Sequence, residues 1–534
     1  MPRNRFPHNF NNVPFRRGLF ALSVACLLLV HAPQAMAAEE TKAEDPQAEK
    51  CADTAKESIE TTPEVVTTSH SIEIDGQVIN YTAKAGKLVL RDREGKGTAE
   101  VFFIAYTKDG EDPSNRPVTF SFNGGPGSSS VWLHMGVLGP KRVLLDDDGF
   151  ALPPPHQLVD NEYSLLDETD LVFIDPVSTG FSRPLDFEKE KEFHGLEEDI
   201  ESVGEFIRLY VTEFSRWPSP KFLIGESYGT TRASALSLHL QNRYGMYFNG
   251  VMLVSSILDF STARFNEGND LPYILFLPSE AATAWYHRKL PAKLQKLSLD
   301  DFLREVEQFA TSTYRDALFA GDSLPQEDLE TVAARLADYT GLPQEDYLRE
   351  RLRVRAYEFF DLLLKDQNKR VGRFDSRYVG GSTYTWERHE AGVDPSYSQV
   401  YGAYSGGFND YLRSELNYES DLPYEILTSV VRPWNYGVEG EAQYVNVANR
   451  LREALVMNPF LQVHVCCGYY DLATPYFAAE YTVNRLMLDP ELRDNITLSY
   501  YKGGHMMYTV REELARQKEA LAGFIRSAPR AGRN

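Results

Sequence analysis

The chain of 534 residues is long enough for two to four domains, or for one large α/β unit that carries insertions. Its 43% hydrophobic and 12% aromatic content is ordinary for a globular protein and excludes disorder over most of its length. The net charge of −22 argues against nucleic acid and anionic membrane surfaces as partners, because both carry negative charge.

Residues 1–37 are predicted to be a cleaved signal peptide, so we expect an exported protein, periplasmic or secreted. Arginines precede an apolar stretch at 18–30, and Ala-Met-Ala at 35–37 fits a cleavage site. The apolar stretch is too short to span a bilayer, so no stable membrane insertion is expected after removal. Arg16-Arg17 would suit a twin-arginine route and Cys26 a lipoprotein, which leaves the export route open.

Residues 38–68 form an acidic stretch with few large apolar side chains, predicted to be a disordered leader. Without Cys26, three cysteines remain, and such a number does not make a disulfide scaffold. No cysteine or histidine spacing resembles a zinc site, so we expect no metal and no cofactor.

The folded part is predicted to begin near Ser69 with antiparallel strands. Asp75-Gly76 lies between two alternating apolar runs, which indicates a hairpin, and strands at 87–90 and 100–106 follow. Further strands are predicted at 118–122, 171–174, 222–224 and 251–254. Helices are predicted at 196–214, on apolar residues three and four positions apart, and after Gly229. Residues 69–260 therefore predict a mostly parallel sheet covered by helices on both faces.

Around residue 260 the alternation of strands and helices stops. Residues 261–440 are predicted to be a helical cap insertion, with helices at 299–309, 325–339 and 343–364 and irregular Tyr- and Gly-rich sequence to about 436. Such insertions are expected to roof the active site. The turn at 372–375 has no predicted role beyond local structure. The sheet resumes in 441–534, with strands at 461–467 and 496–501 and a closing helix at 511–525.

A G-x-S-x-G sequence at 225–229 lies between an apolar strand and a run of small residues. This is the strand-to-helix turn that lifts a nucleophilic serine out of an α/β-hydrolase sheet, so Ser227 is the predicted nucleophile. The alternative is a Gly-Ser turn with a structural role only.

A serine nucleophile needs a base and a group that orients the base, and in this fold they follow in the order serine, acid, histidine. His505 comes directly after a predicted strand, and Asp471 occupies the equivalent loop one strand earlier. The other histidines that follow Ser227 lie in helices, in the insertion or within a strand: His239, His287, His389 and His464. Of these, His464 is expected to be a hydrogen-bonded core residue.

Acyl transfer also needs hydrogen-bond donors for the developing oxyanion. The backbone N–H of Tyr228, directly after the predicted nucleophile, is one candidate. A glycine-rich loop at 123–127, after a strand, is the candidate source of a second, although such a sequence also suits an ordinary turn.

Five motifs together resemble the serine carboxypeptidase family. In chain order they are Asn-Gly-Gly-Pro-Gly-Ser-Ser-Ser at 123–130, Leu-Gly-Pro at 138–140, Asp-Pro-Val-Ser-Thr-Gly-Phe-Ser at 175–182, the Gly-Glu-Ser-Tyr-Gly of the serine turn, and Gly-His-Met at 504–506. The insertion matches the family only in position. The resemblance implies an α/β-hydrolase fold and release of C-terminal residues from peptides through an acyl-enzyme.

The resemblance also implies roles for four further residues. The N–H groups of Gly125 and Tyr228 would form the oxyanion hole, and Asn123 and Glu226 would bind the C-terminal carboxylate of the substrate. Two carboxylates in contact cannot both stay ionised, so Glu226 would be protonated and activity would be best at acidic pH. The alternative is that Glu226 is merely the variable residue of the serine turn.

The chain departs from the family pattern in three places. Val137 stands where a glutamate usually supports the carboxylate site, the 175–182 motif is one residue short before its glycine, and the disulfides of the family are largely missing. These departures weaken the prediction of C-terminal cleavage more than that of serine hydrolysis. A serine esterase or acyltransferase, or a binding relative without activity, remain the alternatives. The sequence predicts neither side-chain preference nor oligomeric state.

Overall fold

A computed structural model describes residues 65–381, 394–438 and 443–529. They belong to one compact unit that begins at Thr62. The predicted signal peptide and most of the predicted acidic leader lie outside the described residues. The first strand, β1, begins at Val66, so the fold starts earlier than the predicted position at Ser69, inside the range 38–68.

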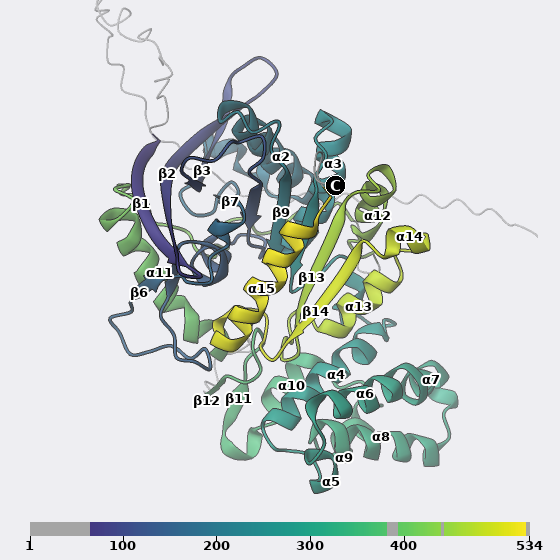
Figure 1. The fold of residues 1–534 in the computed structure, drawn as a ribbon. Helices are drawn as coiled ribbons and strands as arrows, with labels where there is room; N and C mark the ends of the chain where they lie inside the picture. Colours follow the sequence, from purple (N-terminus) through teal and green to yellow (C-terminus); the bar gives the residue numbers. More distant parts are fainter. Residues whose placement is uncertain (1–64, 382–393, 439–442, 530–534) are drawn as a thin grey trace, which may run out of the picture. The chain divides into compact units, whose positions relative to one another are not determined.

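The unit is built on one ten-stranded sheet (Figure 1). In spatial order its strands are β1 (Val66–Ile74), β2 (Gln77–Arg91), β3 (Gly97–Lys108), β7 (Asp170–Ile174), β4 (Val118–Phe122), β9 (Lys221–Glu226), β10 (Gly250–Val254), β13 (Gln462–Gly468) and β14 (Ile496–Tyr501), and the short β8 (Arg183–Pro184) pairs with β3. The pairs from β1 to β7 are antiparallel, and all pairs from β7 to β14 are parallel. The predicted mostly parallel sheet, opened by antiparallel strands, is confirmed.

The predicted hairpin at the start of the sheet is also confirmed. Ile74 pairs with Gln77, so Asp75 and Gly76 form a two-residue turn. Their φ angles of 49° and 73° are those of the turn that matches the twist of the two strands. Glycine adopts such an angle without steric cost, which explains the Asp-Gly sequence.

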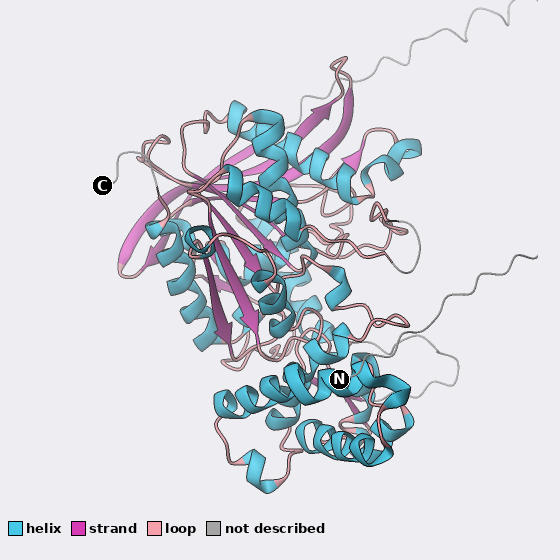
Figure 2. Ribbon diagram, turned by 90° about the vertical axis from the view of Figure 1, so that its right-hand side faces the viewer, coloured by secondary structure: helices cyan, strands magenta, loops and turns pink. Residues whose placement is uncertain are grey.

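Helices cover both faces of the sheet (Figures 1 and 2). One apolar core contains residues of α2 (Leu196–Glu213), α3 (Tyr228–Tyr244), α12 (Ala448–Met457) and α13 (Tyr476–Asn484). The core on the other face contains residues of α1 (Val131–Leu133), α11 (Pro395–Ser414) and α15 (Arg511–Ser527). The strands between them are buried on both sides, which explains their continuous apolar sequences. This is the architecture of the α/β-hydrolase fold.

A group of helices follows β10 and packs beside α13. It consists of α4 (Leu271–Tyr286), α5 (Ala292–Gln295), α6 (Leu299–Phe309), α7 (Arg315–Ala320), α8 (Gln326–Thr340), α9 (Gln344–Arg349) and α10 (Ala356–Leu362). The predicted helix at 343–364 is wrong in its continuity: Arg351 and Leu352 have φ angles of 49° and 70°, which no α-helix contains, so α9 and α10 are separate.

The remainder of the predicted insertion is more ordered than expected. The strands β11 (Lys369–Val371) and β12 (Val379–Gly381) form a hairpin, and the 20-residue α11 lies where irregular sequence was predicted. Buried side chains of α11, including Tyr404 and Phe408, belong to the core of the main sheet. Residues 261–440 are therefore not one helical cap, because α11 is a covering helix of the sheet itself.

No helix within the described ranges is long and apolar enough to cross a bilayer. The adjacent Cys466 and Cys467 on β13 are buried free thiols, as small apolar residues of a core strand would be.

Candidate active site

Ser227 occupies a sharp turn between β9 and α3. Its φ and ψ of 59° and −128° are unusual for a residue with a side chain and indicate local strain. The flanking glycines are required by space: a Cβ on Gly225 would lie 2.1 Å from the carbonyl oxygen of Gly229, and a Cβ on Gly229 would lie 2.8 Å from that of Phe122. The serine hydroxyl is thereby presented at the carboxyl edge of the parallel strands.

Asp471 and His505 lie in the loops that follow β13 and β14, two neighbouring strands of the sheet. Nδ1 of His505 is 2.7 Å from Oδ2 of Asp471, and both side chains are buried. The hydroxyl of Thr474 donates to the same carboxylate oxygen at 2.8 Å, while the N–H groups of Ala473 and Thr474 donate to Oδ1. Four hydrogen bonds therefore hold the Asp471 carboxylate, and the one to Nδ1 holds the imidazole of His505 in its orientation.

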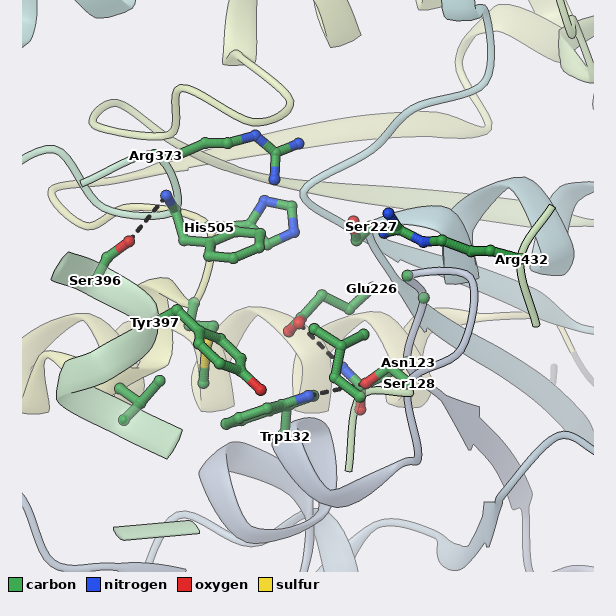
Figure 3. Close-up of a pocket in the computed structure, with 16 residues that line it drawn as sticks. Asn123, Ser128, Trp132, Glu226, Ser227, Arg373, Ser396, Tyr397, Arg432 and His505 are labelled. Carbon is green, nitrogen blue, oxygen red and sulfur yellow. Dashed lines mark hydrogen bonds between the residues drawn. The ribbon is translucent and has the colours of Figure 1, made fainter. Parts of the chain in front are cut away.

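The other ring nitrogen of His505, Nε2, is available to accept a proton. Among the described residues, Nε2 is buried and has no hydrogen-bond partner. Figure 3 shows the imidazole facing Ser227 across the pocket. Burial disfavours the imidazolium, but the adjacent Asp471 carboxylate and its hydrogen bond outweigh this effect, so the pKa of His505 is raised.

The other histidines do not join this group. His464 lies within β13, where its ring contacts the hydroxyls of Thr497 and Ser499 at 2.8 and 3.0 Å, as expected for a hydrogen-bonded core residue. His287 contacts the carbonyl oxygen of Ser376, and His239 lies within α3. His389 lies outside the described residues.

The glycine-rich loop after β4 lies directly on the serine turn. A Cβ on Gly124 would be 2.4 Å from the backbone nitrogen of Tyr228, so only glycine permits this approach. Gly125 and Gly127 have φ angles of 104° and 103°, which also favour glycine. Tyr228 is the first residue of α3, and the first N–H groups of a helix have no partner within the helix. The loop and the helix start are thus brought together beside Ser227.

Glu226 and Asn123 are hydrogen-bonded to each other. Nδ2 of Asn123 donates to Oε1 of Glu226 at 3.0 Å, and the hydroxyl of Tyr508 donates to Oε2. Burial raises the pKa of Glu226 to about 7, against the opposing effects of His505 and of these two hydrogen bonds. Val137 is fully buried in the apolar core, so its position supplies no carboxylate to Glu226.

A pocket of about 190 Å³ brings these residues together (Figure 3). Its walls come from the glycine-rich loop, α1, the serine turn, the β11–β12 hairpin, α11, the segment before residue 433 and the His505 loop. The residues that line it are Asn123, Gly124, Gly125, Ser128, Trp132, Glu226, Ser227, Arg373, Phe374, Ser396, Tyr397, Val400, Leu427, Arg432, His505 and Met506. The helices α4 to α10 contribute none of them. Parts of the predicted insertion at 261–440 do line the site, but they are its irregular parts and α11 rather than α4 to α10.

The turn at 372–375, which had no predicted role, contacts the two loops that carry Asp471 and His505. The carbonyl oxygen of Phe374 accepts the N–H of His505 at 2.5 Å, and Oδ2 of Asp375 accepts the N–H of Gly504 at 3.1 Å. The N–H of Leu472 donates to the carbonyl oxygen of Arg373 at 3.1 Å. Nothing in the local sequence marks these contacts, because their partners lie about a hundred residues or more further along the chain.

Comparison with known proteins gives a family match over most of the folded part of the chain. A family model described as serine carboxypeptidase matches residues 77–527. The serine carboxypeptidase-like 33 protein of Arabidopsis thaliana is 30% identical over 145 residues, which cover 25% of this chain and 27% of that protein. The pheromone-processing carboxypeptidase KEX1 of Saccharomyces cerevisiae is 33% identical over 156 residues, covering 27% of this chain and 20% of that protein.

Among solved structures, a thermostable carboxyl esterase from Bacillus coagulans is 12% identical, with a TM-score of 0.34 over 83% of this chain and 98% of the esterase. The matched stretches span only about a quarter of the two carboxypeptidase relatives. The family model, in contrast, extends from β2 to the last residue of α15. On that match, this chain belongs to the serine carboxypeptidase family.

Proposed function

We propose that the protein is a serine carboxypeptidase that releases the C-terminal residue of peptides through an acyl-enzyme. The observation that carries the proposal is the 2.7 Å contact between Asp471 and Nδ1 of His505, which leaves Nε2 directed to the pocket that Ser227 lines. With Nδ1–H bound to the carboxylate, Nε2 is the basic nitrogen of the neutral ring and can take the proton of the serine hydroxyl.

The proposed reaction has two halves. Ser227 Oγ attacks the last peptide carbonyl while its proton passes to His505 Nε2, and the oxyanion accepts hydrogen bonds from the N–H groups of Gly125 and Tyr228. The imidazolium then protonates the leaving amine, and the C–N bond breaks. Water, deprotonated by the same imidazole, releases the shortened peptide from Ser227.

Binding of the peptide end is assigned to Asn123 and Glu226. A substrate carboxylate can share a hydrogen bond with Glu226 only when Glu226 carries a proton. The raised pKa of about 7 keeps this buried carboxyl protonated in mildly acidic solution, so we propose that activity is best at acidic pH. Residues 1–37 remain a proposed signal peptide, the part of 38–68 that precedes β1 remains a proposed leader, and the mature enzyme is a proposed periplasmic or secreted protein.

Labelling and digestion together test the proposal. A fluorophosphonate should react with the wild-type protein and not with Ser227→Ala. The wild-type protein should shorten a peptide with a free C-terminus at pH 5, one residue at a time by mass spectrometry, and leave the C-terminally amidated peptide intact.

Two results would point to the alternatives. Labelling of Ser227 together with hydrolysis of simple esters but of neither peptide would identify an esterase or acyltransferase, a reading that the buried Val137 favours. Absence of labelling in the folded wild-type protein would identify a binding relative without catalytic activity.

A further inference from the structure

Two arginines line the pocket beside the proposed catalytic residues. Arg373 lies in the loop between β11 and β12, and Arg432 lies in a segment that runs along the glycine-rich loop. The N–H of Thr428 in that segment donates to the carbonyl oxygen of Gly127 at 2.9 Å. Both arginine side chains are exposed to solvent, so both can be reached by a substrate.

Neither guanidinium is neutralised by an ion pair with another described residue. Arg373 packs over the ring of Phe374, 5.0 Å from its centre. The two carboxylates whose charge acts on Arg373 are Asp394 and Asp471. Oδ1 of Asp394 accepts from the backbone of Arg373 and from the N–H and hydroxyl of Ser396, while Asp471 is bound by His505 and Thr474.

Other exposed arginines of the described ranges, such as Arg243 and Arg485, also lack an ion pair with a described residue, but Arg373 and Arg432 both line one pocket. The buried arginines of the described chain are mostly paired: Arg216 with Asp170, Arg232 with Asp199 and Arg377 with Asp375. Arginines that have no carboxylate partner among the described residues concentrate positive potential around a concave site, and they attract anionic ligands.

The arginines lie away from the proposed site of the peptide end. In Figure 3, Arg373 lies above His505 and the guanidinium of Arg432 lies at the level of Ser227, whereas Asn123, Glu226 and Trp132 lie below them. If the C-terminal residue enters the lower part of the pocket, the residue that precedes the cleaved bond lies on the arginine side. That residue belongs to the acyl group transferred to Ser227.

We infer that the enzyme prefers substrates with an acidic residue immediately before the cleaved bond, and that Arg373 and Arg432 bind that carboxylate. The inference rests on the proposed carboxypeptidase function. An arginine–carboxylate pair in a partly enclosed pocket has favourable, often bidentate geometry, whereas a lysine at the same substrate position would be repelled.

The test compares three N-terminally blocked peptides that differ only in the penultimate residue: Glu, Gln or Lys. At pH 5.5 the peptide Glu is ionised and Glu226 is mostly protonated. We expect the wild-type kcat/KM to be about tenfold higher for Glu than for Gln, the gain of one favourable charged hydrogen bond. Lys should be poorest, and 0.5 M salt should reduce the differences.

The variants Arg373→Gln, Arg432→Gln and their combination should bring the Glu/Gln ratio towards one, mainly through KM. The matched control is Arg304→Gln, an exposed arginine of α6 that does not line the pocket, which should keep the wild-type ratio. Arg→Lys at the two pocket positions should keep part of the preference, since the charge is retained.

Three results would overturn the inference while leaving the proposed function intact. One is cleavage of free C-termini with no Glu preference in the wild-type enzyme. Another is a Glu preference unchanged in the double variant. The third is loss of discrimination between free and amidated C-termini in the arginine variants, which would assign the arginines to the terminal carboxylate. If no peptide is cleaved and Ser227 is not labelled, the proposed function itself fails.

Discussion

At the residue scale, Glu226 and His505 determine how the proposed activity depends on pH. The two groups interact, since the charge of each acts on the pKa of the other. The active form has one proton on Glu226 and a neutral imidazole, and a bound substrate carboxylate favours that distribution. Because the pKa of His505 is also raised, stronger acidification protonates the imidazole and lowers activity in turn. As pH rises through about 7 the proton on Glu226 is lost, and we expect the proposed binding of the peptide end to be lost with it.

Glu226→Gln should therefore remove the alkaline fall in kcat/KM. The amide stays neutral at every pH, so the variant should keep its activity towards pH 8, where the wild-type enzyme declines. The measurement is a pH profile of kcat/KM from 4.5 to 8.5 on one peptide. A loss as complete as that of Ser227→Ala at all pH values would contradict the assigned role.

The same substitution has a second readout in stability. Because the pKa of Glu226 is higher in the folded protein than in the unfolded chain, folding is favoured by protonation and weakened as pH rises from about 4.5 through 7. Glu226→Gln should thus raise Tm at pH 8 and change it much less at pH 5, as followed by circular dichroism.

Gly124→Ala should damage catalysis through the loop that carries Gly125. The added Cβ would lie 2.4 Å from the nitrogen of Tyr228, so the loop must move away from the serine turn. Loss of one oxyanion donor costs about 10²–10³ in kcat. The control is Gly523→Ala in α15, where a Cβ meets nothing within 4 Å and alanine favours the helix. Equal kcat values in the two variants would contradict this role of the loop.

At the scale of elements, local sequence signals were reliable where neighbours in sequence determine the structure. The Asp75-Gly76 hairpin, the serine turn and the strand that ends before His505 all follow from short-range patterns. The helix α11 is not predicted because its three-residue run of Ser and Gly at 405–407 and its many tyrosines have low helix propensity, and burial against the sheet stabilises it.

The sequence predicts the proposed catalytic residues of the site but not the walls of the pocket. Ser227, Asp471 and His505 each follow a strand, and parallel strands bring their carboxyl ends to one edge. Arg373 and Arg432 lie outside such strands, and their places in the pocket depend on contacts with distant segments. Tyr508 donates to Glu226 and Thr474 donates to Asp471, and neither contact could be predicted from the sequence, because each depends on how the chain folds around the site.

The β11–β12 hairpin gives a prediction at this scale. Asp375 is paired with Arg377 and accepts the N–H of Gly504, the residue before His505. Asp375→Asn should weaken both contacts and lower kcat more than it changes KM, since the imidazole is held less firmly. The control is Asp361→Asn, which breaks the partly exposed pair with Arg370 of the same hairpin. If both variants lower kcat equally, Asp375 has only a structural role.

At the scale of the whole molecule, the helices after β10 share an apolar core with the sheet. Leu336 of α8 and Leu253 of β10 belong to the same buried cluster. The helical group should therefore not unfold separately from the sheet.

Leu336→Ala tests this coupling. Removal of a fully buried leucine side chain costs about 2–5 kcal/mol. We expect calorimetry to show one transition, shifted to lower temperature, and activity to be lost in the same range. Two separate transitions, with activity following the one that the variant leaves unchanged, would show that the helical group is an independent unit.

The order of the proposed catalytic residues along the chain has a consequence for biosynthesis. The ribosome makes Ser227 first, then the whole of the helical group and the hairpin that supports His505, and only later the acid and the base. A nascent chain that has grown just past the hairpin contains the nucleophile without the means to activate it. Translation itself would thus delay the appearance of the proposed peptide-cleaving activity in the cell that makes the protein.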